Sequence, residues 1–267
     1  MSAPDTPLLT TPLNQAHIDA GARMVEFAGY SRPVQYPMGV MAEHLWTREH
    51  CGIFDVSHMG QARLVGVSPL SAFEEVVPGD YIGLKPGKQK YSVLLNRTGG
   101  IIDDLMAGRP LRPDGTPDEA LFVVVPGACK ENDFKVIDAE LAGQVRIDRL
   151  EDRALTAVQG PEAAAVVNAL VPATADMVFM DIRMMPGLGT DLIISRSGYT
   201  GEDGYEISVP ATEAVRVWNT LLADGRVRAI GLGPRDSLRL EAGLPLYGHD
   251  LDETVSPVEA GLTFAIN

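Results

Sequence analysis

The stretch that decides the fold is Tyr91-Ser92-Val93-Leu94-Leu95-Asn96-Arg97-Thr98-Gly99-Gly100-Ile101-Ile102-Asp103-Asp104-Leu105. Two apolar runs flank a turn with paired glycines, a pattern that predicts a β-hairpin. Because successive strand residues point to opposite faces of a sheet, Asp103 and Asp104 cannot both face solvent. One of them must point inward beside apolar side chains. A carboxylate is costly there unless it is paired or takes part in chemistry.

Outward from this hairpin, strand and helix patterns alternate without the strict rhythm of a parallel barrel. The sequence predicts helices over 14–27, 40–50, 69–77, 129–141, 160–170, 211–222 and 233–241. It predicts strands over 53–57, 91–95, 101–107, 120–125, 144–150, 154–159, 177–185, 191–196, 205–209 and 261–267. The mixed order, with mainly antiparallel strand contacts, indicates an α+β fold. Similar strand–helix–strand sets on either side of residue 150 suggest two similar subdomains. The apolar last seven residues suggest a fragment of a longer protein.

Composition excludes several classes of function. The 267 residues carry 22 basic and 36 acidic side chains, a net charge of −14 that argues against a nucleic-acid partner. No apolar run approaches the roughly 20 residues of a membrane span, and residues 1–6 have no feature of a secretory or transit signal. Cys51 and Cys129 form neither a disulfide framework nor a metal pair, and the histidines lack metal-site spacing. We therefore expect a cytoplasmic protein with no metal and no membrane partner.

A second candidate for chemistry is the segment 197–206, Ser-Gly-Tyr-Thr-Gly-Glu-Asp-Gly-Tyr-Glu. Its three glycines allow positive φ and close approach of the backbone. Aromatic faces beside a fixed carboxylate suit a flat heterocycle with an amidine edge, such as a pterin or guanine. A tight β-turn with solvated acids explains the pattern equally well.

A third candidate is the segment 231–241, Gly-Leu-Gly-Pro-Arg-Asp-Ser-Leu-Arg-Leu-Glu. It begins like a dinucleotide-binding fingerprint, but the third glycine is missing and Pro234 intrudes, so we reject that interpretation. Arg235, near the start of the predicted helix, is placed to bind a carboxylate. A salt bridge within the chain is the alternative.

Several motifs then occur in an order typical of one family. They lie at 11–13, 21–25, 27–29, 54–60, 99–105, 198–206, 231–233, 235–236, 239–241, 247–248, 250 and 252–253. With these segments the chain resembles the glycine cleavage system T-protein (aminomethyltransferase) family and its folate-dependent relatives. The resemblance covers almost the whole chain.

The resemblance implies a fold and a reaction. The family transfers an aminomethyl group from the lipoyl arm of H-protein to tetrahydrofolate, giving methylenetetrahydrofolate and ammonia. It implies an α+β fold of two mixed, mainly antiparallel subdomains that form a folate-binding unit, with the family's C-terminal β-barrel domain missing here. We expect residues 1–58 plus 146–220 in the first subdomain and 59–145 plus 221–267 in the second.

The resemblance also implies the site residues. Asp104 matches the family's catalytic aspartate, and the expected ligand-binding residues are Met59, Tyr91, Tyr199, Glu206, Arg235 and Phe264. Glu206 can pair with the amino-pyrimidinone edge of the pterin while tyrosines flank the ring. Asp104 could orient the nucleophilic nitrogen, take its proton or stabilise the cation formed as ammonia leaves.

Three departures from the family pattern bear on this assignment: the loss of an asparagine, two aromatic replacements and the missing C-terminal domain. Pro126 replaces a frequent asparagine, and Tyr30 and Phe264 replace frequent tryptophans. Loss of the amide motivates a second hypothesis, a folate-dependent demethylase of an N-, O- or S-methyl compound. A third is a non-catalytic folate-binding protein of the kind linked to iron–sulfur cluster assembly. The cysteine-centred signature of such proteins is absent, because Cys51 and Cys129 stand in other contexts.

Overall fold

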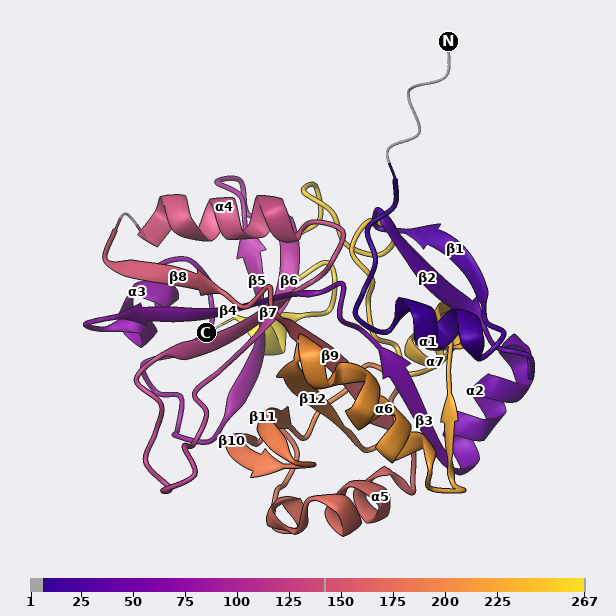
Figure 1. The fold of residues 1–267 in the computed structure, drawn as a ribbon. Helices are drawn as coiled ribbons and strands as arrows, with labels where there is room; N and C mark the ends of the chain where they lie inside the picture. Colours follow the sequence, from indigo (N-terminus) through magenta and orange to yellow (C-terminus); the bar gives the residue numbers. More distant parts are fainter. Residues whose placement is uncertain (1–6, 142, 267) are drawn as a thin grey trace.

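The computed structural model describes residues 7–141 and 143–266. Residues 1–6, where no targeting signal is expected, and residue 267 of the expected last strand lie outside the described residues. Within them the strands form three sheets whose order is β1-β2, β10-β11-β12-β9-β3-β13 and β5-β6-β7-β4-β8 (Figure 1). We call them the hairpin sheet, the large sheet and the small sheet.

The elements have the following bounds. The helices are α1 Asn14–Asp19, α2 Val40–Glu49, α3 Pro69–Glu74, α4 Lys130–Leu141, α5 Ala163–Leu170, α6 Ala214–Leu222 and α7 Leu232–Glu241. Short 3-10 turns lie at Pro172–Thr174, Ala211–Glu213 and Thr263–Ala265. The strands are β1 Arg23–Phe27, β2 Tyr30–Gln35, β3 Cys51–Asp55, β4 Gly60–Gly66, β5 Gln89–Leu95, β6 Ile101–Gly108, β7 Leu121–Val125, β8 Val145–Arg149, β9 Arg153–Gln159, β10 Ile182–Gly187, β11 Thr190–Ser195, β12 Gly204–Pro210 and β13 Val227–Ala229.

Antiparallel pairing dominates these sheets, and β13 beside β3 is the parallel pair. This confirms the predicted α+β class. No helix within the described ranges has the length and apolar character to cross a membrane.

The small sheet has two differently covered faces. Along β7, Leu121, Val123 and Val125 pack with Phe134 and Ile137 of α4 in one apolar cluster. Phe122 and Val124, the alternate residues, belong to another cluster that also contains residues of the large sheet. This is the period of two expected for a strand buried on both faces.

The large sheet repeats this arrangement. Tyr205, Ile207 and Val209 of β12 pack in a cluster with residues of α5 and α6. Leu155 of β9 and Ile193 of β11 instead share the cluster that holds Phe122 and Val124. The two sheets therefore face each other across this shared cluster, with α4 on the outer face of the small sheet and α5 and α6 on that of the large sheet. Side chains that alternate with the helix-facing residues project into the space between the sheets.

The N-terminal region differs from its prediction. The expected helix over 14–27 ends at Asp19, and 23–27 form β1 instead. Gly21 has a φ of +72°, which ends the helix, and the turn at Ala28 and Gly29 also has positive φ. Val25 pairs with Arg32 in the hairpin. Tertiary pairing of the hairpin outweighs the helical spacing of the apolar residues.

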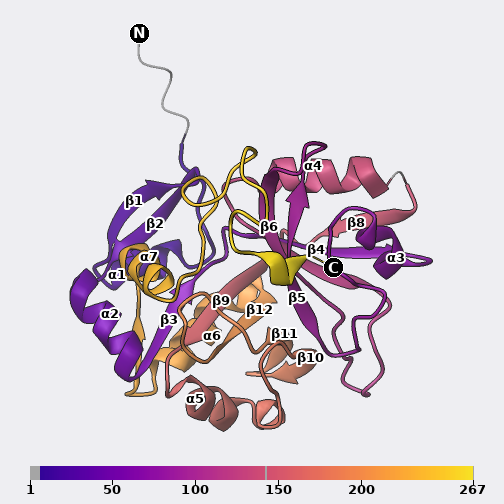
Figure 2. The same cartoon turned by 180° about the vertical axis from the view of Figure 1, so that it is seen from behind.

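The C-terminal region also differs. Residues 263–265 form a 3-10 turn and no strand. The chain from Tyr247 onward lies along the β5–β6 hairpin, where Ile101 donates its N–H to the carbonyls of Asp252 (3.1 Å) and Val255 (3.0 Å). Figure 2 shows this yellow segment crossing in front of β5 and β6. Its buried residues Leu251, Leu262 and Ala265 share a cluster with Val93 and Ile101.

Sheet membership differs from the expected subdomain limits at two places. β8 belongs to the small sheet, so the chain passes to the large sheet at about residue 150 instead of 146. β13 extends the large sheet, and α7 packs on α2 and β2, so residues 227–241 lie beside the large sheet. Only the segment after α7 returns to the small sheet, because Leu251 and Leu262 are buried there.

Candidate functional site

The Asp103–Asp104 pair lies on β6 of the small sheet. Asp103 is fully buried on the face that carries Leu105 and Ala107, toward the helices. Asp104 lies on the opposite face with Met106, which contacts the cluster between the sheets, and Asp104 is half-buried. The two acids therefore point to opposite faces of the sheet, as the alternation of a strand requires. Asp103 is the more deeply buried of the two.

Asp104 is held by a neighbour on β5. The Tyr91 hydroxyl donates a hydrogen bond of 2.8 Å to Asp104 Oδ2. Burial raises the pKa of Asp104, and the hydrogen bond from Tyr91 opposes that shift. Burial, followed by the charge of Asp104, raises the pKa of Tyr91, so its hydroxyl keeps its proton. The Tyr91 ring lies 5.8 Å from that of Phe264, which is 73% exposed on the C-terminal turn.

Glu206 lies on the facing wall, on β12 of the large sheet. It alternates with Tyr205 and Ile207, which face the helices, so its side chain is on the side of the small sheet. The Ser197 hydroxyl donates to Glu206 Oε2 at 3.3 Å. Burial raises the pKa of Glu206, and the positive charge of Arg235 opposes the increase.

Tyr199 lies in the loop that precedes β12 and contacts α7 and the segment after it. The Arg235 guanidinium lies 4.9 Å from the centre of the Tyr199 ring, and the Tyr199 hydroxyl donates to the Pro245 carbonyl. Burial, with a further contribution from the charge of Asp104, raises the pKa of Tyr199 to about 12. Arg235 Nη1 is buried and has no hydrogen-bond partner among the described residues, so it is available to a ligand. Asp104, Tyr199, Arg235 and Glu206 thus form one electrostatically connected group.

Met59 lies in the turn between β3 and β4. Its side chain packs against the apolar cluster between the sheets. Gly60, the residue after Met59, pairs with Val125, the residue before Pro126. Pro126 is half-buried and has no amide side chain to offer a ligand. Tyr30, another departure, accepts a hydrogen bond of 2.7 Å from Lys130 Nζ.

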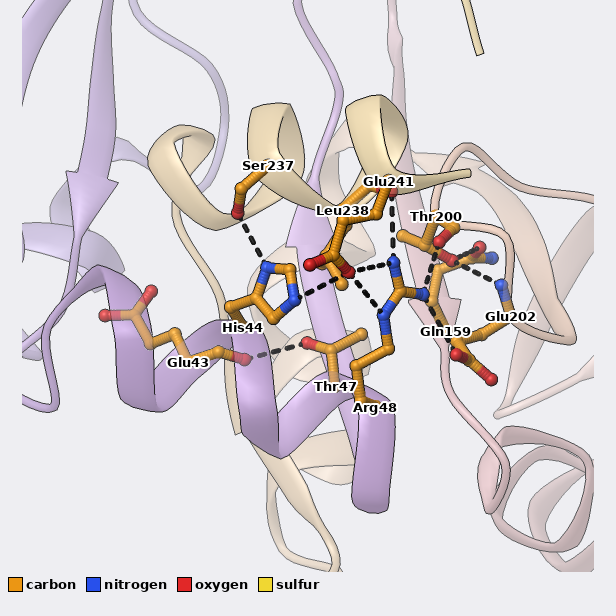
Figure 3. A network of polar contacts seen from close by, with 10 residues as sticks. All are labelled: Glu43, His44, Thr47, Arg48, Gln159, Thr200, Glu202, Ser237, Leu238 and Glu241. Carbon is orange, nitrogen blue, oxygen red and sulfur yellow. Dashed lines mark hydrogen bonds and ion pairs between the residues drawn. The ribbon is translucent and has the colours of Figure 1, made fainter. Parts of the chain in front are cut away.

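A polar network outside the site fixes the loop that carries Tyr199 (Figure 3). Arg48 on α2 donates from Nη1 to the Thr200 carbonyl (2.6 Å) and to Glu202 Oε1 (2.9 Å). Its Nη2 donates to Leu238 O (3.1 Å) and Glu241 Oε2 (3.0 Å) on α7. His44 contacts the same helix, through Ser237 Oγ at 2.7 Å and Glu241 at 3.0 Å. Arg48 therefore links the Tyr199 loop to the helix that carries Arg235.

Sequence reasoning missed a buried ionic group around Asp55. Arg32, 1% exposed, donates to Asp55 Oδ2 at 2.6 Å, and His17 Nε2 lies 2.9 Å from the same atom. Burial alone would raise the pKa of Asp55, but Arg32 and His17 hold it well below its usual range. An aspartate inside the apolar run Ile53-Phe54-Asp55-Val56 was the available signal. Arg32, Asp55 and Arg235 line one small pocket, so this group lies beside the helix start that carries Arg235.

Another cavity lies away from the predicted site residues. A cavity of about 630 Å³ is lined by Ser68, Leu70, Ile82, Arg109 and others, and by none of the predicted site residues. Among the described residues no group of three or more His, Cys, Asp or Glu side chains could hold a metal ion. The predicted site residues Asp104 and Glu206 instead project from the two sheets toward the space between them.

The fold and this group of residues define an α+β protein with a polar site between two facing sheets. The family model for the GCVT N-terminal domain matches residues 13–267, and the chain belongs to this family. The mitochondrial aminomethyltransferase of Dictyostelium discoideum is 43% identical over 97% of this chain and 67% of its own length. The aminomethyltransferase of Synechococcus elongatus is 40% identical, over 97% and 69%.

A solved structure supports the same assignment. The crystal structure of glycine cleavage system aminomethyltransferase T from Bartonella henselae superposes with a TM-score of 0.91 at 39% identity, covering 98% of this chain and 70% of that one. The present chain spans about two thirds of the length of these relatives. The family predicted from the sequence motifs is therefore confirmed.

Proposed function

We propose that this protein transfers the aminomethyl group carried by lipoylated H-protein to tetrahydrofolate, with release of ammonia. Family membership supports transfer of an aminomethyl group. The observation that supports folate as acceptor is the contact of the Arg235 guanidinium with the Tyr199 ring, with the charge of Arg235 acting on Glu206 of the large sheet and with Asp104 on the inner face of the small sheet.

Glu206 and the two tyrosines are suited to the pterin ring. A carboxylate accepts two parallel N–H bonds from an amino-pyrimidinone edge, and aromatic faces pack on the ring. Within the described residues only the Ser197 hydroxyl donates to Glu206, so the carboxylate keeps acceptor capacity for this pairing. Arg235 lowers the cost of the buried negative charge. We propose Met59 and Phe264 as apolar contacts at the edge of the pocket.

Asp104 is the proposed catalytic residue. In the reaction the methylene carbon forms bonds to two folate nitrogens, while its bonds to the amine nitrogen and the lipoyl sulfur break. The two protons of the folate nitrogens are released, one to the amine nitrogen, which leaves as ammonia, and one to the lipoyl sulfur, which becomes a thiol. Asp104 beside these nitrogens would stabilise the cationic methylene species and orient the attacking nitrogen. Tyr91 fixes the carboxylate orientation through its 2.8 Å hydrogen bond.

The test of this proposal is Asp104→Asn. The substitution keeps the shape and the contact with Tyr91 but removes the charge. We expect methylenetetrahydrofolate formation from lipoylated, aminomethylated H-protein to fall by about 100-fold or more, with tetrahydrofolate affinity almost unchanged. Asp114→Asn, in an exposed loop, is the matched control. Normal turnover by Asp104→Asn would contradict the assignment.

The same assays separate the alternatives. Turnover of an N-, O- or S-methyl compound without any lipoylated donor would favour the demethylase, the function that Pro126 motivated. Tetrahydrofolate binding without transfer from either donor would indicate a binding protein. We further propose that the protein works in a reducing, aqueous compartment such as the cytoplasm, where Cys51 and Cys129 remain free thiols.

A further inference from the structure

Asp133 is an acidic residue on the buried side of α4. It is 0% exposed, and it shares this side of the helix with the apolar residues Phe134, Ile137 and Leu141. Neither of its carboxyl oxygens receives a hydrogen bond from an N–H or O–H donor among the described residues. A carboxylate in this position would be a buried charge with no compensation.

Asp103 has its carboxyl on the same buried side of the small sheet, toward α4, and each of these two carboxyls acts on the pKa of the other. Asp103 is also 0% exposed. Its Oδ1 accepts the backbone N–H of Asp104 at 2.8 Å, and its Oδ2 has no donor. Within residues 7–141 and 143–266 neither carboxyl forms an ion pair with a basic side chain.

The remaining titratable groups around the pair supply no positive charge. They are Asp104 on the same strand, Tyr91 on the neighbouring strand β5, Cys129 just before α4, and Tyr247 in the C-terminal segment. Burial raises the pKa of the Cys129 thiol to about 11 and that of Tyr247 to about 12, so both are neutral at pH 7. Two ionised carboxylates in contact without a cation would repel each other, and one of them must take up a proton.

The hydrogen bonds decide which carboxyl takes the proton. The N–H of Asp104 stabilises the ionised form of Asp103, whereas no donor stabilises an ionised Asp133. Burial and the neighbouring carboxylate raise the pKa of both groups, that of Asp103 to about 7 and that of Asp133 to about 9. The hydrogen bonds and the two pKa values therefore both indicate that Asp133 carries the proton.

We propose that Asp133 holds a proton at neutral pH, donates it to the Asp103 carboxylate, and through this acid–carboxylate pair positions Asp104. Asp103 is the link, because it bonds the backbone N–H of Asp104 and so fixes the strand from which the catalytic side chain projects. Asp133 is a positioning residue and does not touch the substrate. The protonation of Asp133 does not depend on the proposed function, whereas its role in positioning Asp104 rests on that function.

Carbon-13 NMR of the whole chain labelled at the aspartate side-chain carboxyl tests the protonation state directly. We expect one aspartate with the chemical shift of a protonated carboxyl at pH 7.5. That signal should be absent from Asp133→Asn and present in Asp138→Asn, an exposed substitution on the same helix. A spectrum without a protonated aspartate at pH 7.5, or one that Asp133→Asn leaves unchanged, would overturn the pair.

Kinetics test the positioning role. The side-chain amide introduced by Asp133→Asn can donate an N–H to Asp103, so this variant should keep most of kcat. Asp133→Ala has no donor and should lose about 10- to 100-fold in kcat, with KM for tetrahydrofolate changed much less. Wild-type kcat in folded Asp133→Ala would refute positioning. If Asp133→Ala does not fold, a loss of kcat of about 10-fold in Asp133→Asn would also refute the positioning role, because this variant keeps the donor to Asp103.

A wild-type protein without transfer activity would refute the proposed function. The NMR result on the protonation state of Asp133 would still hold.

Discussion

His58 is a neutral imidazole enclosed beside the site. It is 5% exposed, its Nδ1 has no hydrogen-bond partner among the described residues, and the ring of Phe27 lies edge-on at 5.7 Å. Burial, and next the charge of Arg32, lowers the pKa of His58 to about 3. The folded protein therefore does not protonate this ring at any pH at which it works.

This residue makes stability depend on pH. Between pH 6.5, the ordinary pKa of histidine, and about 3, the unfolded chain binds a proton that the folded chain excludes. Stability should therefore fall with decreasing pH through this window, by about 1.4 kcal/mol per pH unit from His58 alone. Urea unfolding at pH 7, 6 and 5 measures the effect. His58→Gln should weaken the pH dependence, and the exposed control His249→Gln should not. An identical slope in His58→Gln would contradict the assignment.

At the scale of elements, Arg48 joins three segments of chain that are distant in sequence. One guanidinium bonds the loop at Thr200 and Glu202 and the helix at Leu238 and Glu241. The loop carries Tyr199 and the helix carries Arg235, so their contact across 4.9 Å depends on this link. The planar guanidinium of an arginine can bond all four of these acceptors at once in fixed directions, whereas a lysine has only three donors on one nitrogen.

We expect Arg48→Met to raise the Kd for tetrahydrofolate by about 10-fold and to speed hydrogen exchange of residues 198–204. The matched control is Arg183→Met on β10. Arg183 has the same side-chain exposure of 22% and also bonds a carbonyl and a carboxylate, Ala173 and Asp176. Isothermal titration and exchange mass spectrometry give the two readouts. Equal effects of both substitutions would show a general loss of stability and no specific role of Arg48.

Local patterns predicted those elements whose hydrogen bonds and apolar faces are encoded nearby. The β5–β6 hairpin follows from its alternation and from Gly99, which has a φ of +88°. The N-terminal hairpin was missed because apolar residues at helical spacing compete with strand pairing that only the folded chain supplies. Arg48 and Asp133 were missed for a related reason. Their partners are 152 or more residues away for Arg48 and on another element for Asp133, so no spacing in the sequence reveals them.

At the scale of the whole molecule, the two walls of the site belong to two sheets that pack on each other. The shared apolar cluster sets the distance between them, with Phe122 from the small sheet against Leu155 and Ile193 from the large one. The C-terminal segment closes one side, where a Cβ on Gly100 would lie 1.8 Å from the Glu253 carbonyl. Only glycine permits this close approach. The turn of the β5–β6 hairpin therefore packs directly against the C-terminal segment that carries Phe264.

A ligand between the sheets should therefore protect both sheets together. Tetrahydrofolate at about 100 times its Kd should raise the free energy of unfolding by about 2.7 kcal/mol. Hydrogen exchange should slow in β6 and in β12 at once, because Asp104 and Glu206 lie on these two strands. Glu206→Gln at the same ligand concentration should lose most of the stabilisation, because it removes the carboxylate for the pterin edge, whereas the exposed control Glu151→Gln should keep it. Slower hydrogen exchange in only one of the two sheets would show that the ligand binds outside this interface, because a ligand held by both sheets slows exchange in both.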